Sequence, residues 1–109
     1  MSVELKEFSI VPDVSNAQAG KVTFTVKNVG SIEHEFVVLK TDLAPGSIPV
    51  VGGKANEEAT GVSNVGEIAE FGAGKTVTKA FELTAGKYVF VCNIPGHYTG
   101  GMRTAFEVK

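Results

Sequence analysis

Apolar and polar residues alternate along much of the chain, and this period of two is typical of half-buried β-strands. The clearest example is the segment 21–27, in which valine and phenylalanine alternate with lysine and threonine. Segments with the same alternation follow at 34–38, 77–83, 88–92 and 102–108. Near the start, Val3 and Leu5 alternate, but Phe8 and Ile10 fall in the opposite phase. This slip predicts a bulge or bend.

No stretch of about 11 residues or more keeps the 3.6-residue apolar period of an amphipathic helix. The least regular segment, 41–64, contains proline and several glycines. We expect it to form a long excursion with one helical turn near 55–59. Short strands separated by turn residues predict an all-β fold, a Greek-key β-sandwich of about seven to eight strands.

The length of 109 residues predicts a single domain that spans residues 1–109. A formal net charge of −2 leaves no basic excess to neutralise phosphates, which argues against nucleic-acid binding. No apolar run approaches the roughly 20 residues that a transmembrane helix needs. The segment Met1–Glu4 has neither the charged nor the apolar part of a secretory signal, so none is expected within this chain.

Residues that bind soft metals are scarce and regularly spaced. The one cysteine, Cys92, begins the pattern C-x4-H-x4-M, which continues with His97 and Met102 between two predicted strands. The only other histidine, His34, lies on a strand with apolar neighbours. Two imidazoles and a thiolate, with a thioether as a long axial ligand, form the ligand set of blue-copper sites.

The segment 86–102 resembles the copper loop of the cupredoxins, the type 1 blue copper proteins. Its spacing is most similar to that of the rusticyanin, sulfocyanin and auracyanin group, because the gap between cysteine and histidine is shorter in plastocyanin. The resemblance implies a cupredoxin-like sandwich that binds one type 1 copper through His34, Cys92, His97 and Met102. It also implies electron transport by Cu(I)/Cu(II) cycling, in the periplasm or elsewhere outside the cytoplasm.

One position departs from this family. Asparagine or serine often follows the first histidine ligand, whereas this chain has Glu35 there and Asn93 after the cysteine. We hypothesise that the roles are exchanged and that the Asn93 amide donates to the Glu35 carboxylate, orienting the ligands. We interpret Glu57 and Glu58 as a solvated surface.

We expect His97 to be the ligand nearest to solvent, because it lies in mid-loop after Pro95 and Gly96. An apolar surface around it would dock transient redox protein partners to a monomeric chain. The residues expected to form that surface are Ile94, Pro95 and Tyr98, joined by Leu43, Pro45, Ile48 and Pro49 from the excursion.

The main alternative function is copper storage or delivery, which the closed ligand set disfavours. Catalysis, as in copper nitrite reductases or multicopper oxidases, needs further copper ligands, and both histidines are already assigned. We therefore expect that the protein is not an enzyme. A dinuclear CuA centre needs two cysteines, and the chain has one. A metal-free sandwich is disfavoured because the ligand set is complete.

Overall fold

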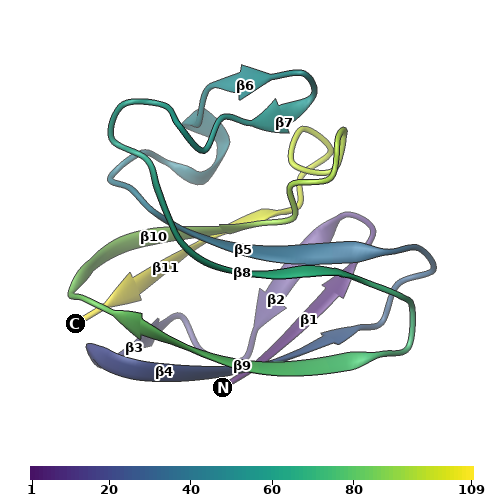
Figure 1. Cartoon of the computed structure of the whole chain (residues 1–109), viewed down its shortest axis with the longest axis horizontal. Coiled ribbons are helices and arrows are strands. Elements are labelled where there is room, and N and C mark those ends of the chain that lie inside the picture. The colour runs from purple at the N-terminus through teal and green to yellow at the C-terminus, as the bar shows by residue number, and fades with distance from the viewer.

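Two β-sheets pack face to face in the computed structural model, which describes residues 1–109 (Figure 1). The first sheet has the strand order β2 (Ser9–Pro12), β1 (Ser2–Lys6), β4 (Gly20–Asn28), β9 (Thr76–Leu83). The second has the order β3 (Asn16–Ala17), β11 (Arg103–Val108), β10 (Gly86–Val91), β5 (His34–Lys40), β8 (Ser63–Phe71). The remaining elements are the 3-10 helix η1 (Pro45–Ser47) and a small sheet of β6 (Val50–Val51) and β7 (Lys54–Ala55).

The predicted all-β sandwich is confirmed. Each segment with period-two alternation overlaps a strand: 21–27 with β4, 34–38 with β5, 77–83 with β9, 88–92 with β10 and 102–108 with β11. Cys92 and Met102 lie one residue outside β10 and β11. In the core between the sheets, Phe24 packs against four other phenylalanines, Phe36, Phe81, Phe90 and Phe106, at ring-centroid distances of 5.4, 5.8, 5.5 and 6.4 Å. Burial of such large rings is the main favourable contribution to the stability of a fold of this size.

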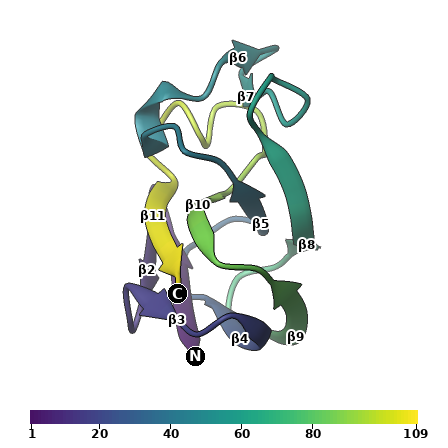
Figure 2. The ribbon, with the colours of Figure 1, turned by 90° about the vertical axis from the view of Figure 1, so that its left-hand side faces the viewer.

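Strands β5 and β10 are buried on both faces, unlike the half-buried β4. Their inner residues belong to the core between the sheets, and their outer residues form a second cluster with the excursion that follows β5. Figures 1 and 2 show that η1, β6 and β7 lie at one end of the molecule, beyond β5 and β10. The second cluster consists of Val37, Leu39, Ile48, Ala55, Val62, Val89, Val91 and Tyr98.

Two local expectations need correction. The helical turn is η1 at 45–47, whereas 55–59 begins with β7 and continues as non-helical turns. There the Asn56 side chain accepts a hydrogen bond from the Glu58 amide at 3.0 Å, a local alternative to helical pairing. The phase slip after Leu5 is a chain reversal between the antiparallel strands β1 and β2, and it leaves Phe8 45% exposed.

No helix of this structure combines the length and the apolar character that crossing a membrane requires.

Candidate metal centre

Antiparallel pairing of β5 with β10 brings the first histidine to the cysteine. In this register Val91 lies opposite Val37, so the beginning of β5 is adjacent to the end of β10. His34 is the first residue of β5, and Cys92 directly follows β10. Both side chains point inward, because they continue the alternation that buries Phe36 and Phe90 between the sheets.

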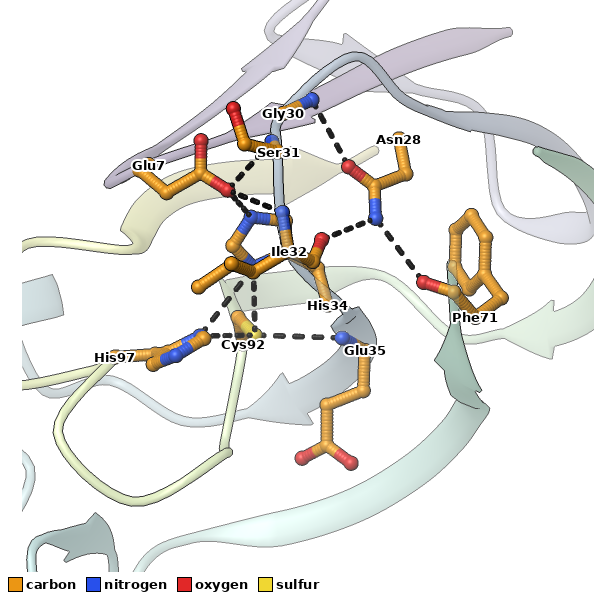
Figure 3. Close-up of polar contacts among 10 residues, drawn as sticks. All are labelled: Glu7, Asn28, Gly30, Ser31, Ile32, His34, Glu35, Phe71, Cys92 and His97. Atoms are coloured by element: carbon orange, nitrogen blue, oxygen red, sulfur yellow. Dashed lines mark hydrogen bonds and ion pairs between the residues drawn. The ribbon is translucent and has the colours of Figure 1, made fainter. Parts of the chain in front are cut away.

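His34, Cys92 and His97 form a compact cluster at this end of the sandwich (Figure 3). Nδ1 of His34 lies 3.3 Å from Nδ1 of His97 and 3.7 Å from Sγ of Cys92. Nδ1 of His97 lies 3.4 Å from the same sulfur. The three donor atoms therefore form a nearly equilateral triangle.

The triangle has the size that a metal ion requires. A point equidistant from its corners lies about 2 Å from each donor, close to the lengths of ~2.0–2.3 Å at which imidazole nitrogen and thiolate sulfur bind divalent zinc. Two imidazoles with one thiolate form the softer donor set that blue-copper sites use. The buried cluster thus suits one type 1 copper.

The fourth expected residue, Met102, lies at the base of the same loop and is fully buried. Its backbone carbonyl accepts a hydrogen bond from the Cys92 amide at 3.1 Å, and its amide donates to the His97 carbonyl at 3.0 Å. Met102 is thereby tied through its backbone to two members of the cluster. Its assignment as a copper ligand stays a prediction.

Turns within the loop fix the position of His97. Gly96 has a φ of 85°, a left-handed conformation that glycine adopts without strain. The His97 amide donates to the Ile94 carbonyl at 2.9 Å, and the Gly100 amide donates to the Gly96 carbonyl at 3.0 Å. His97 is 9% exposed, whereas His34, Cys92 and Met102 are 0% exposed, so His97 is the member nearest to solvent, as predicted.

Two features of the surroundings shift the pKa of the Cys92 thiol in opposite directions. Burial raises its pKa above the usual range, which favours the neutral thiol in the absence of a metal. The Glu35 backbone amide donates to Sγ at 3.3 Å and stabilises the thiolate. For His97, burial and then the neighbouring His34 lower the pKa, and both effects favour the neutral imidazole that binds metals.

Sequence reasoning missed Glu7, which reaches the cluster from the turn between β1 and β2. Its Oε1 lies 3.0 Å from Nε2 of His34. Hydrogen bonds from its own backbone amide and from those of Ser31 and Ile32, together with that from His34, outweigh partial desolvation and lower its pKa to about 2. The only sequence signal near Glu7 was the phase slip between Leu5 and Phe8.

The hypothesis that the Asn93 side chain donates to Glu35 is wrong. The Asn93 amide group donates to the Ala55 carbonyl at 3.0 Å and to the Glu57 carboxylate at 2.7 Å. The backbone of β7 offers a donor and an acceptor that together match the side-chain amide. Glu57 is therefore a partner of the copper loop and not merely a solvated surface residue.

The Glu35 side chain is half-buried and does not receive the hydrogen bond expected from the Asn93 side chain. Its pKa is raised, mainly by burial and then by repulsion from Glu67, although the Asn93 backbone amide opposes the shift. The Glu35 backbone amide donates to Sγ of Cys92, whereas its half-buried side chain points away from the sulfur (Figure 3).

The expected apolar surface also needs correction. Tyr98 and Ile48 are buried, because the Tyr98 hydroxyl donates to the Pro45 carbonyl at 2.6 Å and accepts from the Ile48 amide at 3.1 Å. Phe8, absent from the expected surface, lies edge-on to the His97 ring at a centroid distance of 5.2 Å.

A family profile described as copper binding proteins of the plastocyanin/azurin family matches residues 1–109. No curated protein sequence matches the chain.

Several solved structures share the fold. A reduced auracyanin from Roseiflexus castenholzii is 23% identical with a TM-score of 0.71, covering 99% of this chain and 94% of that one. Auracyanin A from Chloroflexus aurantiacus, described as a "blue" copper protein, is 21% identical with a TM-score of 0.67. The match covers 100% of this chain and 98% of that one. A rusticyanin from Thiobacillus ferrooxidans is 20% identical with a TM-score of 0.61. The match covers 99% of this chain and 77% of that one. The expected resemblance to the auracyanin and rusticyanin group is confirmed.

Proposed function

The chain belongs to the plastocyanin/azurin family of copper-binding proteins, and from this premise we propose that it is a mononuclear type 1 copper protein that transfers single electrons between redox partners. The observation that carries the proposal is the buried triangle of His34 Nδ1, Cys92 Sγ and His97 Nδ1. It combines one thiol and two imidazoles at metal-binding separation in a family that binds copper.

In this proposal His34, Cys92 and His97 hold the ion, and Met102 supplies a weaker thioether donor. Copper bound there would alternate between Cu(I) and Cu(II), which supplies one-electron chemistry. His34, Cys92 and Met102 are fully buried, which keeps water away from their donor atoms. The exclusion of water keeps the donor set unchanged between the two oxidation states.

Backbone hydrogen bonds hold the donor residues in place. The register of β5 with β10 fixes His34 relative to Cys92, and the loop turns fix His97 and Met102. A rigid set of donors suits electron transfer, because little rearrangement then accompanies a change in charge. The Glu35 amide assists by donating to the sulfur in its thiolate form.

We propose that electrons enter and leave beside His97, the most exposed member of the cluster. Phe8 packs against its ring, and Pro95 is exposed in the same loop. These apolar side chains would form a small docking surface for transient partners of a monomeric protein. By family, this activity belongs in the periplasm or another compartment outside the cytoplasm.

The test is the visible spectrum of the metal-free protein after addition of one equivalent of Cu(II). We expect an intense thiolate-to-copper charge-transfer band and reversible one-electron reduction. Cys92→Ser should abolish the band, whereas Met102→Leu should keep it and raise the reduction potential, since removal of a donor destabilises Cu(II) more than Cu(I). Absence of the band while Cys92 is reduced would overturn the proposal. Loss of copper to a chelator within seconds would favour storage or delivery instead.

A further inference from the structure

We propose that Glu7 is a positioning residue of the copper site, whose carboxylate fixes the tautomer and orientation of His34. The inference deepens the proposed function and rests on it where copper binding is concerned. It assigns a role to the turn between β1 and β2, which contributes no metal ligand and lies far from the copper loop in sequence.

The first step concerns protons. Oε1 of Glu7 lies 3.0 Å from Nε2 of His34, and it is the acceptor of the backbone N–H groups of Ser31 and Ile32, which can only donate. Nε2 of His34 must therefore carry the hydrogen, and in the neutral ring Nδ1 keeps a free lone pair. This lone pair faces the sulfur of Cys92 and Nδ1 of His97 (Figure 3). Glu7 thus selects the tautomer that presents Nδ1 to a metal.

The second step concerns how Glu7 itself is held. The same Oε1 accepts hydrogen bonds from the backbone amides of Ser31 at 2.9 Å and Ile32 at 3.0 Å. These two donors hold the carboxylate in place and aim it at His34. Because Ser31 and Ile32 lie just before Glu33 and the start of β5, the carboxylate is anchored to the same segment as the ring that it orients.

The third step concerns the loop that presents these amides. Asn28 is buried, and its side chain donates to the carbonyls of Ile32 at 2.8 Å and Phe71 at 3.0 Å. Its oxygen accepts from the Gly30 amide at 3.0 Å. One asparagine therefore fixes the path of residues 28–32 and the direction of the donors that meet Glu7.

The fourth step concerns space. A Cβ atom at Gly30 would lie 2.6 Å from Oε1 and 2.7 Å from Oε2 of Glu7, which is closer than real contacts allow. Glycine is needed here for the close approach of the carboxylate and not for a left-handed φ, since Gly30 is not among the positive-φ glycines. The Glu7 carboxylate is thus held by two backbone donors, in a loop whose path the buried Asn28 fixes, and it fits there because Gly30 has no side chain.

Two consequences follow for a bound copper ion. A carboxylate on the outer nitrogen of a ligand histidine makes the ring a stronger donor, and loss of such a partner typically weakens metal binding 10- to 100-fold. The negative charge also stabilises the more positive Cu(II) state, so that removal of the charge should raise the reduction potential.

The test uses Glu7→Gln, Glu7→Ala and Gly30→Ala, with Glu33→Gln as the matched control. Glu33 precedes His34 in sequence and is exposed, so its removal deletes a nearby charge without a hydrogen bond to the ring. Gly30→Ala keeps the carboxylate but displaces it. Amide NMR spectra of each metal-free variant check that the fold is retained.

The first readout needs no copper. Nitrogen-15 NMR of the metal-free protein, at a pH where the imidazoles are neutral, should show His34 protonated at Nε2 in the native chain. Glu7→Ala and Gly30→Ala should give a mixture of tautomers, and the control should match the native chain. A native His34 protonated at Nδ1 would overturn the inference even if copper binds.

The second readout uses copper affinity and reduction potential. We expect the two alanine variants to bind copper 10- to 100-fold more weakly and Glu7→Gln to show a higher potential than Glu33→Gln. Equal values for all variants and the control would refute the role of Glu7. If the native chain gave no charge-transfer band, the proposed function would fail, while the NMR readout would still decide whether Glu7 fixes His34.

Discussion

The side-chain amide of Asn93 pairs with both backbone groups of Ala55, accepting from its N–H at 2.8 Å and donating to its carbonyl at 3.0 Å. Asn93 directly follows Cys92, and Ala55 ends β7. All three residues are buried. The excursion after β5 is therefore attached to the copper loop next to the cysteine.

Asn93→Ala should destabilise the metal-free protein by about 2–4 kcal/mol, because it leaves a buried N–H and a buried carbonyl of Ala55 without partners. The free energy of unfolding in urea measures the loss. Asn16→Ala is the matched control, since the Asn16 side chain is exposed and makes one long contact, to Ser15 at 3.5 Å. A loss no larger than that of the control would show that water replaces both hydrogen bonds.

Glu57→Gln should cost about 1–2 kcal/mol of unfolding free energy. The two carboxylate oxygens of Glu57 accept from the side-chain amides of Asn93 and Asn64, each at 2.7 Å. A glutamine would turn an NH2 group toward one of these donors and lose that hydrogen bond. The exposed neighbour provides the control, Glu58→Gln, which should change stability by less than about 0.5 kcal/mol. Equal effects of the two substitutions would contradict the bridging role of Glu57.

The main strands could be predicted because their signal is local. Alternation around Phe24 or Phe106 records which face of a strand meets the core, and this pattern does not depend on the partner strand. The loop from Cys92 to Met102 was equally accessible, since three residues of uncommon type stand at a regular spacing within one short segment.

The partners of these residues could not be predicted because they are non-local. Glu7 reaches His34 across 27 positions, and Asn93 reaches Ala55 across 38. No periodicity marks the excursion, so the sequence did not indicate that its backbone would form hydrogen bonds with the Asn93 side chain. The same cause led to the expectation that Tyr98 is exposed, because its hydroxyl partners lie in η1 and beside it.

Tyr98→Phe should lower the unfolding free energy by about 1–3 kcal/mol. The substitution removes a donor to the Pro45 carbonyl and leaves the buried Ile48 amide without an acceptor. Tyr88→Phe serves as the comparison, because it deletes a single hydrogen bond to the carbonyl of the exposed Thr84. We expect the smaller loss there, measured by thermal or urea unfolding. If Tyr88→Phe lowered the unfolding free energy more than Tyr98→Phe does, the buried Ile48 amide would not explain the loss of stability in Tyr98→Phe.

Gly66→Ala should destabilise the sandwich by about 1–3 kcal/mol through overpacking. A Cβ atom at this position of β8 would lie 2.3 Å from Cδ1 of Phe81, a core residue of β9. The control is Gly72→Ala, where the nearest atom is Cε of Lys75 at 4.0 Å. Its unfolding midpoint should stay near that of the native chain. Similar midpoints for both variants would mean that the Phe81 ring moves aside without cost.

The exposed edge of Phe8 beside His97 leads to a kinetic prediction about docking. Phe8→Ala should slow electron exchange between the Cu(I) and Cu(II) forms of the protein, because it removes apolar surface next to His97, the most exposed member of the cluster. Line broadening in NMR spectra of mixed oxidation states measures the exchange rate. The visible spectrum of the same samples shows whether the copper site itself has changed.

Val14→Ala is the control, since Val14 has a similar exposure, 46% against 45% for Phe8, but lies beyond the far end of β2 from Phe8. It should leave the exchange rate unchanged. The double variant Ile94→Ala with Pro49→Ala tests the surface first expected from the sequence, and it should have a smaller effect because Ile94 is half-buried. If Phe8→Ala exchanged electrons at the native rate with an unchanged spectrum, partners would have to approach the site over another surface.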